Sequence, residues 1–310
     1  PSSYIPTSGS AVTRAAETLT VPAANLPWPT PVVIGTELVT NGTFDTDTSG
    51  WASARANSTL SIVGGKLRVT ATAAGAYGLT SSASIETGFV CQASIDCVAS
   101  SGNTLLNFRV ADPQNLSSNL VISKDLIVGE SASGVAYSST VKYVGVIAVA
   151  SAGGSYFEVD NISVKEVNPL SVSIQMDGRM TYADRDIGNS PNGDSGEVVF
   201  SRWYAGSQDF IAQSVLTNGG TGSAYFIQKS YFYSDAVQAV DYFSPSVNVP
   251  FNIASRHGSN FINGATDGTA LTANTTPTDL PDLSASDLTL GSTFMGTIGK
   301  FRVWSDDLTD

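Results

Sequence analysis

The chain has 310 residues, which is enough for two domains that each bury a core of ordinary size. Only 14% of the residues are charged and 29 are glycine, a composition typical of strand-and-turn proteins rather than helical ones. The formal net charge of -12 argues against electrostatic binding to nucleic acid or to an anionic membrane. The sequence has no apolar run of the roughly 18 residues that a membrane span needs, so we expect neutral, cationic or protein partners and no membrane insertion.

Residues 1–36 are predicted to form an extended N-terminal arm or linker. The stretch from Pro22 to Pro31 is rich in proline, which favours polyproline or extended backbone over a packed domain. The chain also begins at Pro1 without a signal peptide and stops abruptly. We therefore expect it to be a piece of a longer polypeptide.

Residues 37–167 are predicted to form an antiparallel sandwich. Short strand-like runs recur along this segment, separated by turn residues such as Gly64-Gly65 and Asp112-Pro113. The expected strands are 60–63, 66–72, 89–98, 104–111, 121–128, 140–150 and 156–166. Seven or eight strands at this spacing are typical of a sandwich or jelly roll.

Both cysteines fall in the run 89–98, where apolar and polar residues alternate. Cys91 and Cys97 lie six residues apart on one predicted strand, so their Cα atoms would be about 20 Å apart, too far for a disulfide. The alternation points both thiols to the same face. We expect two free thiols in the core.

Residues 168–310 are predicted to form a second sandwich, which begins after Asn168-Pro169 ends the last strand of the first. The expected strands are 170–176, 196–204, 210–215, 224–233, 237–243, 251–257, 260–262 and 298–304. Asn263-Gly264 is a strong turn signal. The predicted fold class is therefore all-β, with two tandem antiparallel β-sandwiches (jelly rolls) preceded by an extended arm.

Two motifs at the ends of the first sandwich carry a family resemblance. Asn-Gly-Thr-Phe-Asp at 41–45 with Gly-Trp at 50–51, and Val-Asp-Asn-Ile-Ser-Val at 159–164, resemble the first and last strands of carbohydrate-binding-module jelly rolls found on secreted glycosidases and phage tail proteins. The resemblance implies a jelly roll and a carbohydrate ligand.

Two further segments resemble known families. Residues 2–14, Ser-Ser-Tyr-Ile-Pro-Thr-Ser-Gly-Ser-Ala-Val-Thr-Arg, look like a segment of phage and prophage structural proteins. The motifs at 251–255, 260–264 and 298–304 resemble the end of concanavalin-A or laminin-G sandwiches. Together these segments imply a virion or extracellular setting, with a second lectin-like module.

In modules resembling the first sandwich, an acidic residue after the first-strand Phe and an Asp in the last strand often hold a structural calcium ion. The matching residues are Asp45 and Asp160. Because calcium takes six or more oxygen ligands, backbone carbonyls and the Asn41 amide would complete the site. Alternatively, Asp45 caps a turn and Asp160 faces solvent.

Sugar binding needs exposed aromatic rings for the C–H faces of a pyranose, together with amides or carboxylates for its hydroxyl groups. The predicted carbohydrate-binding residues are Trp51, Tyr77, Gln92, Asn107, Trp203 and Tyr231. The alternative for Trp51 and Trp203 is a place in the core. Trp304, in an alternating strand, is predicted to be a core residue.

We expect the chain not to be an enzyme. Glu158-Val-Asp160 matches half of the Glu-x-Asp-x-x-Glu motif of concanavalin-A-like glucanases, but Ser163 stands at the third acidic position. His257 is the only histidine and is predicted to lie at the surface beside a turn. A pair of unmarked carboxylates remains the alternative route to hydrolysis.

The function that these features favour is a non-enzymatic structural or adhesion protein of a bacteriophage virion, such as a tail fibre, spike or decoration protein. It would contact other virion proteins and bind host-surface polysaccharide through weak sites summed over a homo-oligomer of three or more copies. One alternative is a purely architectural capsid or tail protein. The other is an accessory carbohydrate-binding region of a secreted polysaccharide-degrading enzyme.

Overall fold

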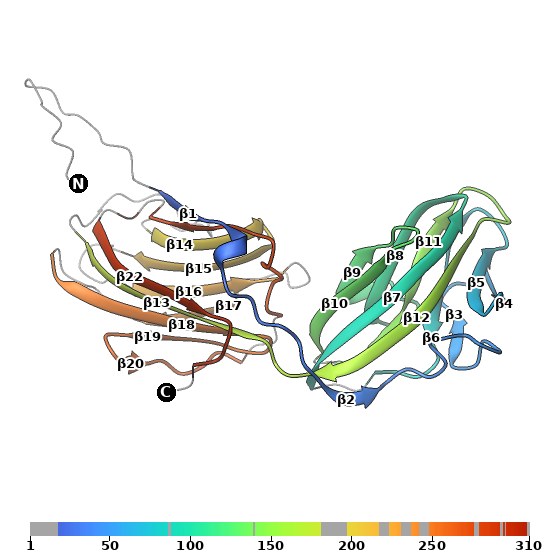
Figure 1. Cartoon of the computed structure of the whole chain (residues 1–310), viewed down its shortest axis with the longest axis horizontal. Helices are drawn as coiled ribbons and strands as arrows, with labels where there is room; N and C mark the ends of the chain where they lie inside the picture. The colour runs from blue at the N-terminus through green and yellow to red at the C-terminus, as the bar shows by residue number, and fades with distance from the viewer. Residues whose placement is uncertain are drawn as a thin grey trace, which may run out of the picture.

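The protein consists of two β-sandwiches that lie side by side along its long axis (Figure 1). The computed structural model describes residues 18–85, 88–138, 140–180, 197–216, 223–230, 237–241, 248–275, 279–291, 294 and 296–308. The regular secondary structure of these residues consists of strands and one 3-10 turn, η1 (Ala23–Asn25). Across these ranges no helix is long and apolar enough to cross a membrane. The all-β prediction is confirmed.

The first sandwich packs a six-stranded sheet against a five-stranded sheet. The six-stranded sheet contains β2 (Val33–Glu37), β4 (Ser58–Val63), β5 (Lys66–Ala71), β7 (Phe89–Ser101), β10 (Ser131–Ser138) and β12 (Tyr156–Val167). The five-stranded sheet contains β3 (Trp51–Ser53), β6 (Gly75–Ser81), β8 (Asn103–Asp112), β9 (Ser118–Asp125) and β11 (Tyr143–Ala150). All their pairings are antiparallel.

The second sandwich has the same two-layer plan. Its six-stranded sheet contains β1 (Leu19–Val21), β14 (Glu197–Gly206), β15 (Asp209–Leu216), β16 (Ser223–Lys229), β17 (Val237–Asp241) and β21 (Leu288–Leu290). Its five-stranded sheet, called here the β13–β22 sheet, contains β13 (Ser171–Met180), β18 (Pro250–Gly258), β19 (Ile262–Thr266), β20 (Thr269–Ala270) and β22 (Gly296–Trp304).

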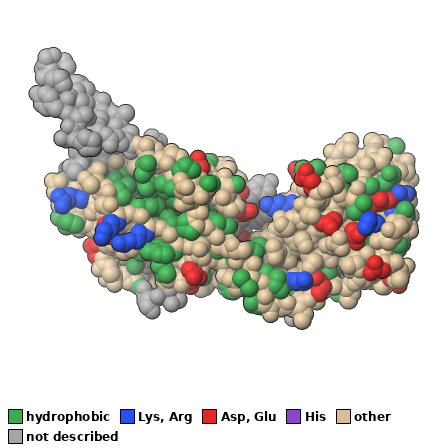
Figure 2. All heavy atoms as spheres, in the orientation of Figure 1, with side chains coloured by type: hydrophobic (Ala, Val, Ile, Leu, Met, Phe, Trp, Pro, Cys, Tyr) green, Lys and Arg blue, Asp and Glu red, His purple; other side chains and the backbone are tan. Residues whose placement is uncertain are grey.

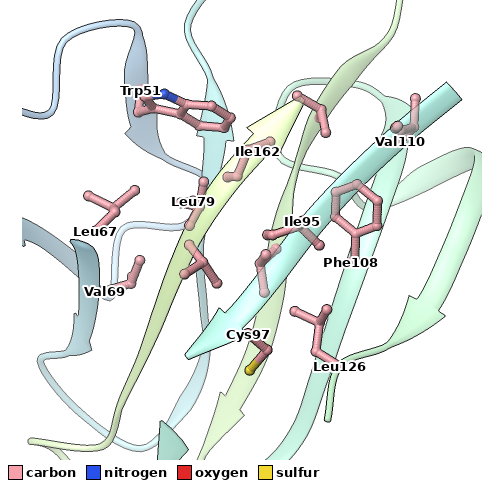
Figure 3. Close-up of a cluster of buried hydrophobic side chains, with 14 of the residues drawn as sticks. Trp51, Leu67, Val69, Leu79, Ile95, Cys97, Phe108, Val110, Leu126 and Ile162 are labelled. Atoms are coloured by element: carbon pink, nitrogen blue, oxygen red, sulfur yellow. The ribbon is translucent and has the colours of Figure 1, made fainter. Parts of the chain in front are cut away.

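Alternation along the strands builds the core of the first sandwich. On β7, Cys91, Ala93, Ile95 and Cys97 point inward and are buried, and they meet residues of the opposite sheet such as Phe108 (Figure 3). Burying one such large apolar side chain stabilises the fold by about 1.5–3 kcal/mol. Both cysteines are free and buried, as predicted.

Residues 19–28 pack with the second sandwich and residues 33–36 belong to β2 of the first, which corrects the prediction of an arm over 1–36 for its described part. Residues 1–17 lie outside the described residues. β1 pairs with β21 in the register Leu19↔Leu290, and Trp28 packs against the core of the second sandwich. The chain then crosses to the first sandwich, starts β2 at Val33, and crosses back after Val167. The first sandwich is thus inserted between β1 and β13, and two crossing segments join the sandwiches.

The crossing segments are hydrogen-bonded to each other. The Val32 N–H donates to Asn168 Oδ1 at 2.6 Å, and the Asn168 N–H donates to the Val32 carbonyl at 2.9 Å. Such pairing satisfies backbone groups that would otherwise need water. It also joins the segment that leaves the first sandwich to the segment that enters it.

The motifs 41–51 and 159–164 meet in space at one seam. The Ile162 N–H donates to the Gly42 carbonyl at 3.0 Å, and the Phe44 and Trp51 rings pack with their centroids 5.5 Å apart. A Cβ on Gly42 would lie 1.9 Å from the Ile162 carbonyl oxygen. Glycine is therefore required where the opening loop touches the closing strand.

The sequence prediction missed several short strands and misplaced one turn. The missed strands in the first sandwich are β2, β3, β6 and β10, and those in the second are β1, β20 and β21. Asn263-Gly264 is not a turn but part of β19, where the Phe226 ring occupies the place of a Cβ on Gly264. The hairpin turns instead at Asp267-Gly268, where both residues have positive φ.

Gly42→Ala should destabilise the first sandwich by about 1–3 kcal/mol, because the added methyl group would overlap a backbone carbonyl. The free energy of unfolding from urea titration measures this loss. Gly206→Ala is the matched control, since a Cβ there meets no atom within 4 Å. Equal effects of the two substitutions would contradict the seam described here.

Candidate functional site

Three predicted sugar platforms lie in the core, so their predicted role as exposed rings is wrong. Trp51, Tyr77 and Trp203 are 6%, 0% and 1% exposed. The Trp51 indole N–H donates to the carbonyls of Thr40 and Asn41, each at 3.1 Å. The alternation of apolar and polar residues shows which side chains share one face of a strand. It does not show which face of the sheet is covered by another layer.

Tyr77 and Trp203 also have their polar atoms bonded inside the protein. The Tyr77 hydroxyl donates to Asn103 Oδ1 at 2.6 Å, and burial raises the pKa of Tyr77 to about 12. The Trp203 N–H donates to the Ser286 carbonyl at 2.8 Å. Neither ring is available to an external ligand.

The remaining predicted carbohydrate-binding residues have different fates. Asn107 is buried in a side-chain network, in which its amide donates to Asp125 at 3.2 Å and accepts from Arg109 at 2.9 Å and Ser123 at 2.8 Å. Gln92 is half-buried on the outer face of β7. Tyr231 lies outside the described residues.

The two predicted calcium ligands each have another partner. Asp160 forms an ion pair with Lys66, and Asp45 is exposed and accepts a hydrogen bond from Thr43 at 2.8 Å. In the described ranges, no group of three or more His, Cys, Asp or Glu side chains could hold a metal ion. A cation at Asp160 would have to displace the Lys66 ammonium, so these residues do not fit a calcium site as they stand. Calcium binding stays a prediction.

The side chains that were considered for catalysis, Glu158 and His257, also have partners within the protein. Glu158 accepts a hydrogen bond from Arg68 Nε at 2.7 Å. His257 is completely buried rather than at the surface, which corrects its predicted position, and burial lowers its pKa to about 3. Its Nε2 lies 2.9 Å from the Ser255 hydroxyl, within the core of the second sandwich.

The four tryptophans divide into two pairs. Trp51 and Trp203 are core residues whose N–H groups are satisfied by backbone carbonyls. Trp28 and Trp304 are half-exposed, and in the described part of the chain their N–H groups have no acceptor. Each of this second pair lines a hollow in the surface.

Trp304 stands at one side of a hollow of about 110 Å³ on the outer face of the β13–β22 sheet. Ala254, Ala265 and Ala270 form its low floor, because they lie directly opposite one another on adjacent strands. Directly opposed residues in antiparallel strands share a face. The hollow thus arises from small side chains beside a large ring.

Polar side chains surround that floor. Gln175 lies directly opposite Ala254 and accepts a hydrogen bond from Arg302 at 3.0 Å. Arg256 donates from Nη2 to Asp307 at 2.8 Å, which neutralises its charge within the protein. Asn263 completes the polar lining.

The prediction of Trp304 as a core residue is wrong, because its side chain lies on the outer face of β22. The members of that strand that pack against the core are Ile298, Phe301 and Val303. Side chains alternate between the two faces along Phe301-Arg302-Val303-Trp304, so Trp304 shares a face with Arg302. Because Arg302 is charged, this shared face could have indicated from the sequence that Trp304 points outward.

Trp28 lines a groove of about 210 Å³ at the junction of the sandwiches, where the outline of the molecule narrows (Figure 2). Gln92 and Ser133 of the first sandwich and Ser284 of the second also line it. From the sequence, Trp28 was predicted to lie in the arm, where no periodic pattern of apolar residues indicates its contacts.

Asp279 lies at the junction and is buried there. The Tyr137 N–H of the first sandwich donates to its Oδ1, and Gln228 of the second donates to its carbonyl at 2.9 Å. Burial raises the pKa of Asp279 to about 8, although the hydrogen bond from Tyr137 and the charge of Lys142 act in the opposite direction.

No protein-family model and no curated protein sequence matches this chain. Similar solved structures include a CBM4 protein, with 12% identity, a TM-score of 0.33, and 41% of this chain and 99% of the other covered. A tandem CBM22 domain of Paenibacillus barcinonensis Xyn10C has 10% identity and a TM-score of 0.32, with 89% and 99% covered. The carbohydrate-binding module CBM66 of Bacillus subtilis has 8% identity and a TM-score of 0.24, with 83% and 96% covered. These values are low, and the function proposed below rests on the chain's own residues.

Asp279→Asn should reduce the loss of stability between about pH 4 and pH 8. In the unfolded chain Asp279 ionises near its ordinary pKa of about 4, whereas in the folded protein it stays protonated up to about pH 8. Ionisation therefore favours unfolding increasingly across this window and adds no further loss above it. Melting temperatures of both proteins across the window measure the effect.

His257 acts in the opposite sense, since its lowered pKa makes stability fall as pH drops from about 6.5 to about 3. It is present in both proteins, so the difference between them isolates Asp279. Asp282→Asn, an exposed carboxyl at the same junction, is the control. Parallel pH profiles of the wild type and Asp279→Asn would contradict the buried position of Asp279.

Proposed function

We propose that this chain is a non-enzymatic glycan-binding protein that holds an uncharged oligosaccharide in the hollow beside Trp304. The observation that carries the proposal is a half-exposed indole whose N–H has no acceptor among the described residues, next to a floor of alanines and a polar rim. Ligand sites in general combine apolar surface with a few placed polar groups. A sugar ring presents both kinds of surface.

The apolar and polar side chains of the hollow would contact different parts of a sugar ring. The indole face and the alanine methyl groups would contact the C–H face of a pyranose, while Gln175 and Asn263 would bond its hydroxyl groups. Arg256, which lines the hollow, is paired with Asp307, so its charge is compensated within the protein. The net charge of -12 also disfavours anionic glycans.

The open, shallow form of the hollow implies weak binding by one copy. We therefore propose that the chain acts in a homo-oligomer of three or more copies, where several weak sites sum to useful avidity. The resemblance of residues 2–14 to phage structural proteins supports a place on a virion that attaches to host-surface polysaccharide. An accessory region of a secreted polysaccharide-degrading enzyme would use the same site chemistry.

Trp304→Ala should lower the association constant for the bound glycan at least about tenfold, equivalent to about 1.4 kcal/mol, because the stacking face is lost. The probe is an array that carries neutral and acidic oligosaccharides, followed by titration calorimetry with the best neutral ligand. The melting temperature should stay close to that of the wild type, since Trp304 is outside the core clusters.

Tyr204→Ala is the matched control, because Tyr204 is an exposed ring of the opposite sheet. Loss of binding in Tyr204→Ala alone would move the site to that sheet. No binding to any glycan on the array would refute the proposed function and leave the architectural role. Release of reducing sugar from a polysaccharide would refute the non-enzymatic part.

A further inference from the structure

We propose that the groove between the two sandwiches is a second saccharide site, in which Trp28 and Gln92 hold a single uncharged sugar ring. This site takes its ligand class from the proposed function but shares no residue with the hollow at Trp304. It requires both sandwiches, because its walls come from each. The proposal rests on four features of the groove.

Trp28 is held as a fixed platform. Its ring packs edge-on against Trp203, with centroids 5.2 Å apart and an interplanar angle of 83°, and Trp203 is itself anchored in the core. Pro29, which follows it, is buried, and proline restricts the backbone. A half-exposed ring that is supported in this way loses little conformational entropy when a ligand stacks on it.

Gln92 of the first sandwich lines the same groove as Trp28. It is half-buried on β7, and its amide has no hydrogen-bonding partner in the part of the chain that the structure describes. Ser133 on the adjacent strand and Ser284 of the second sandwich add hydroxyl groups. These donors and acceptors suit the hydroxyl groups of a sugar.

The charges in the groove favour an uncharged ligand. Among the described residues, its lining includes the exposed Asp282 and no lysine or arginine. Asp279 also lines it, but burial raises the pKa of Asp279 to about 8, so this carboxyl group is neutral at pH 7. A uronic or sialic acid would meet the Asp282 carboxylate without a balancing cation among the lining residues. The Asp282 carboxylate, which accepts from the Ser284 hydroxyl at 2.7 Å, can also accept from a sugar hydroxyl.

The size of the groove limits the ligand. Its volume of about 210 Å³ is below the roughly 300 Å³ at which most ligand pockets begin. That space suits one ring, at the end of a chain or as a free monosaccharide, rather than a long chain in passage. The paired crossing segments and the Tyr137–Asp279 hydrogen bond hold the two walls together.

Saturation-transfer NMR with glucose, galactose, mannose, N-acetylglucosamine and glucuronate tests the proposal. At least one neutral monosaccharide should give a signal with the wild type and with Trp304→Ala, and glucuronate should give none. Gln92→Ala should reduce the signal at least about threefold. Ser94→Ala, which truncates another half-buried polar residue two positions away on β7, should leave it unchanged.

Trp28→Ala should abolish the signal, but it also removes support from Trp203, so Gln92→Ala is the decisive variant. Signals that survive Gln92→Ala, or that disappear only in Trp304→Ala, would overturn the second site. Absence of any monosaccharide signal would also overturn it. Failure of the proposed function is recognised separately, as the absence of oligosaccharide binding that depends on Trp304.

Discussion

The pairing of β1 with β21 determines how the chain is organised. Because Leu19–Val21 completes a sheet whose other strands come from after residue 196, the first sandwich is attached at both ends to the second. Two linked domains joined by one flexible linker move independently by default. Here two crossing segments, hydrogen-bonded through Val32 and Asn168, restrict that motion and keep the walls of the junction groove opposite each other.

Much of the fold could be predicted from local pattern alone. The strands β5 and β7 follow clear alternation of apolar and polar residues. The pairing of β1 could not be predicted, since three residues next to a proline-rich stretch give no period and their partner lies at the opposite end of the chain. The turn predicted at Asn263-Gly264 was wrong because the prediction used only local sequence. The contact between Gly264 and Phe226, which requires glycine there, is tertiary.

The candidate sites were less predictable than the fold, for one physical reason. Sequence identifies an aromatic ring in a strand, but exposure depends on whether another layer covers that face. Trp51 and Trp203 are covered by the opposite sheet or a loop, and Trp304 is not. The two tryptophans of the proposed ligand sites are therefore the two whose exposure was not predicted. Trp28 was predicted to lie in an arm, and Trp304 was predicted to lie in the core.

The inward orientation of both cysteines gives the protein a practical property. Cys91 and Cys97 are 0% and 2% exposed, and burial raises the pKa of Cys91 to about 12 and that of Cys97 above its ordinary value. Thiolate is the form that reacts with maleimides and related labels, so the folded chain behaves toward such reagents as if it had no cysteine. A dye or spin label can then be placed at any single engineered surface position on either sandwich without removing the native thiols.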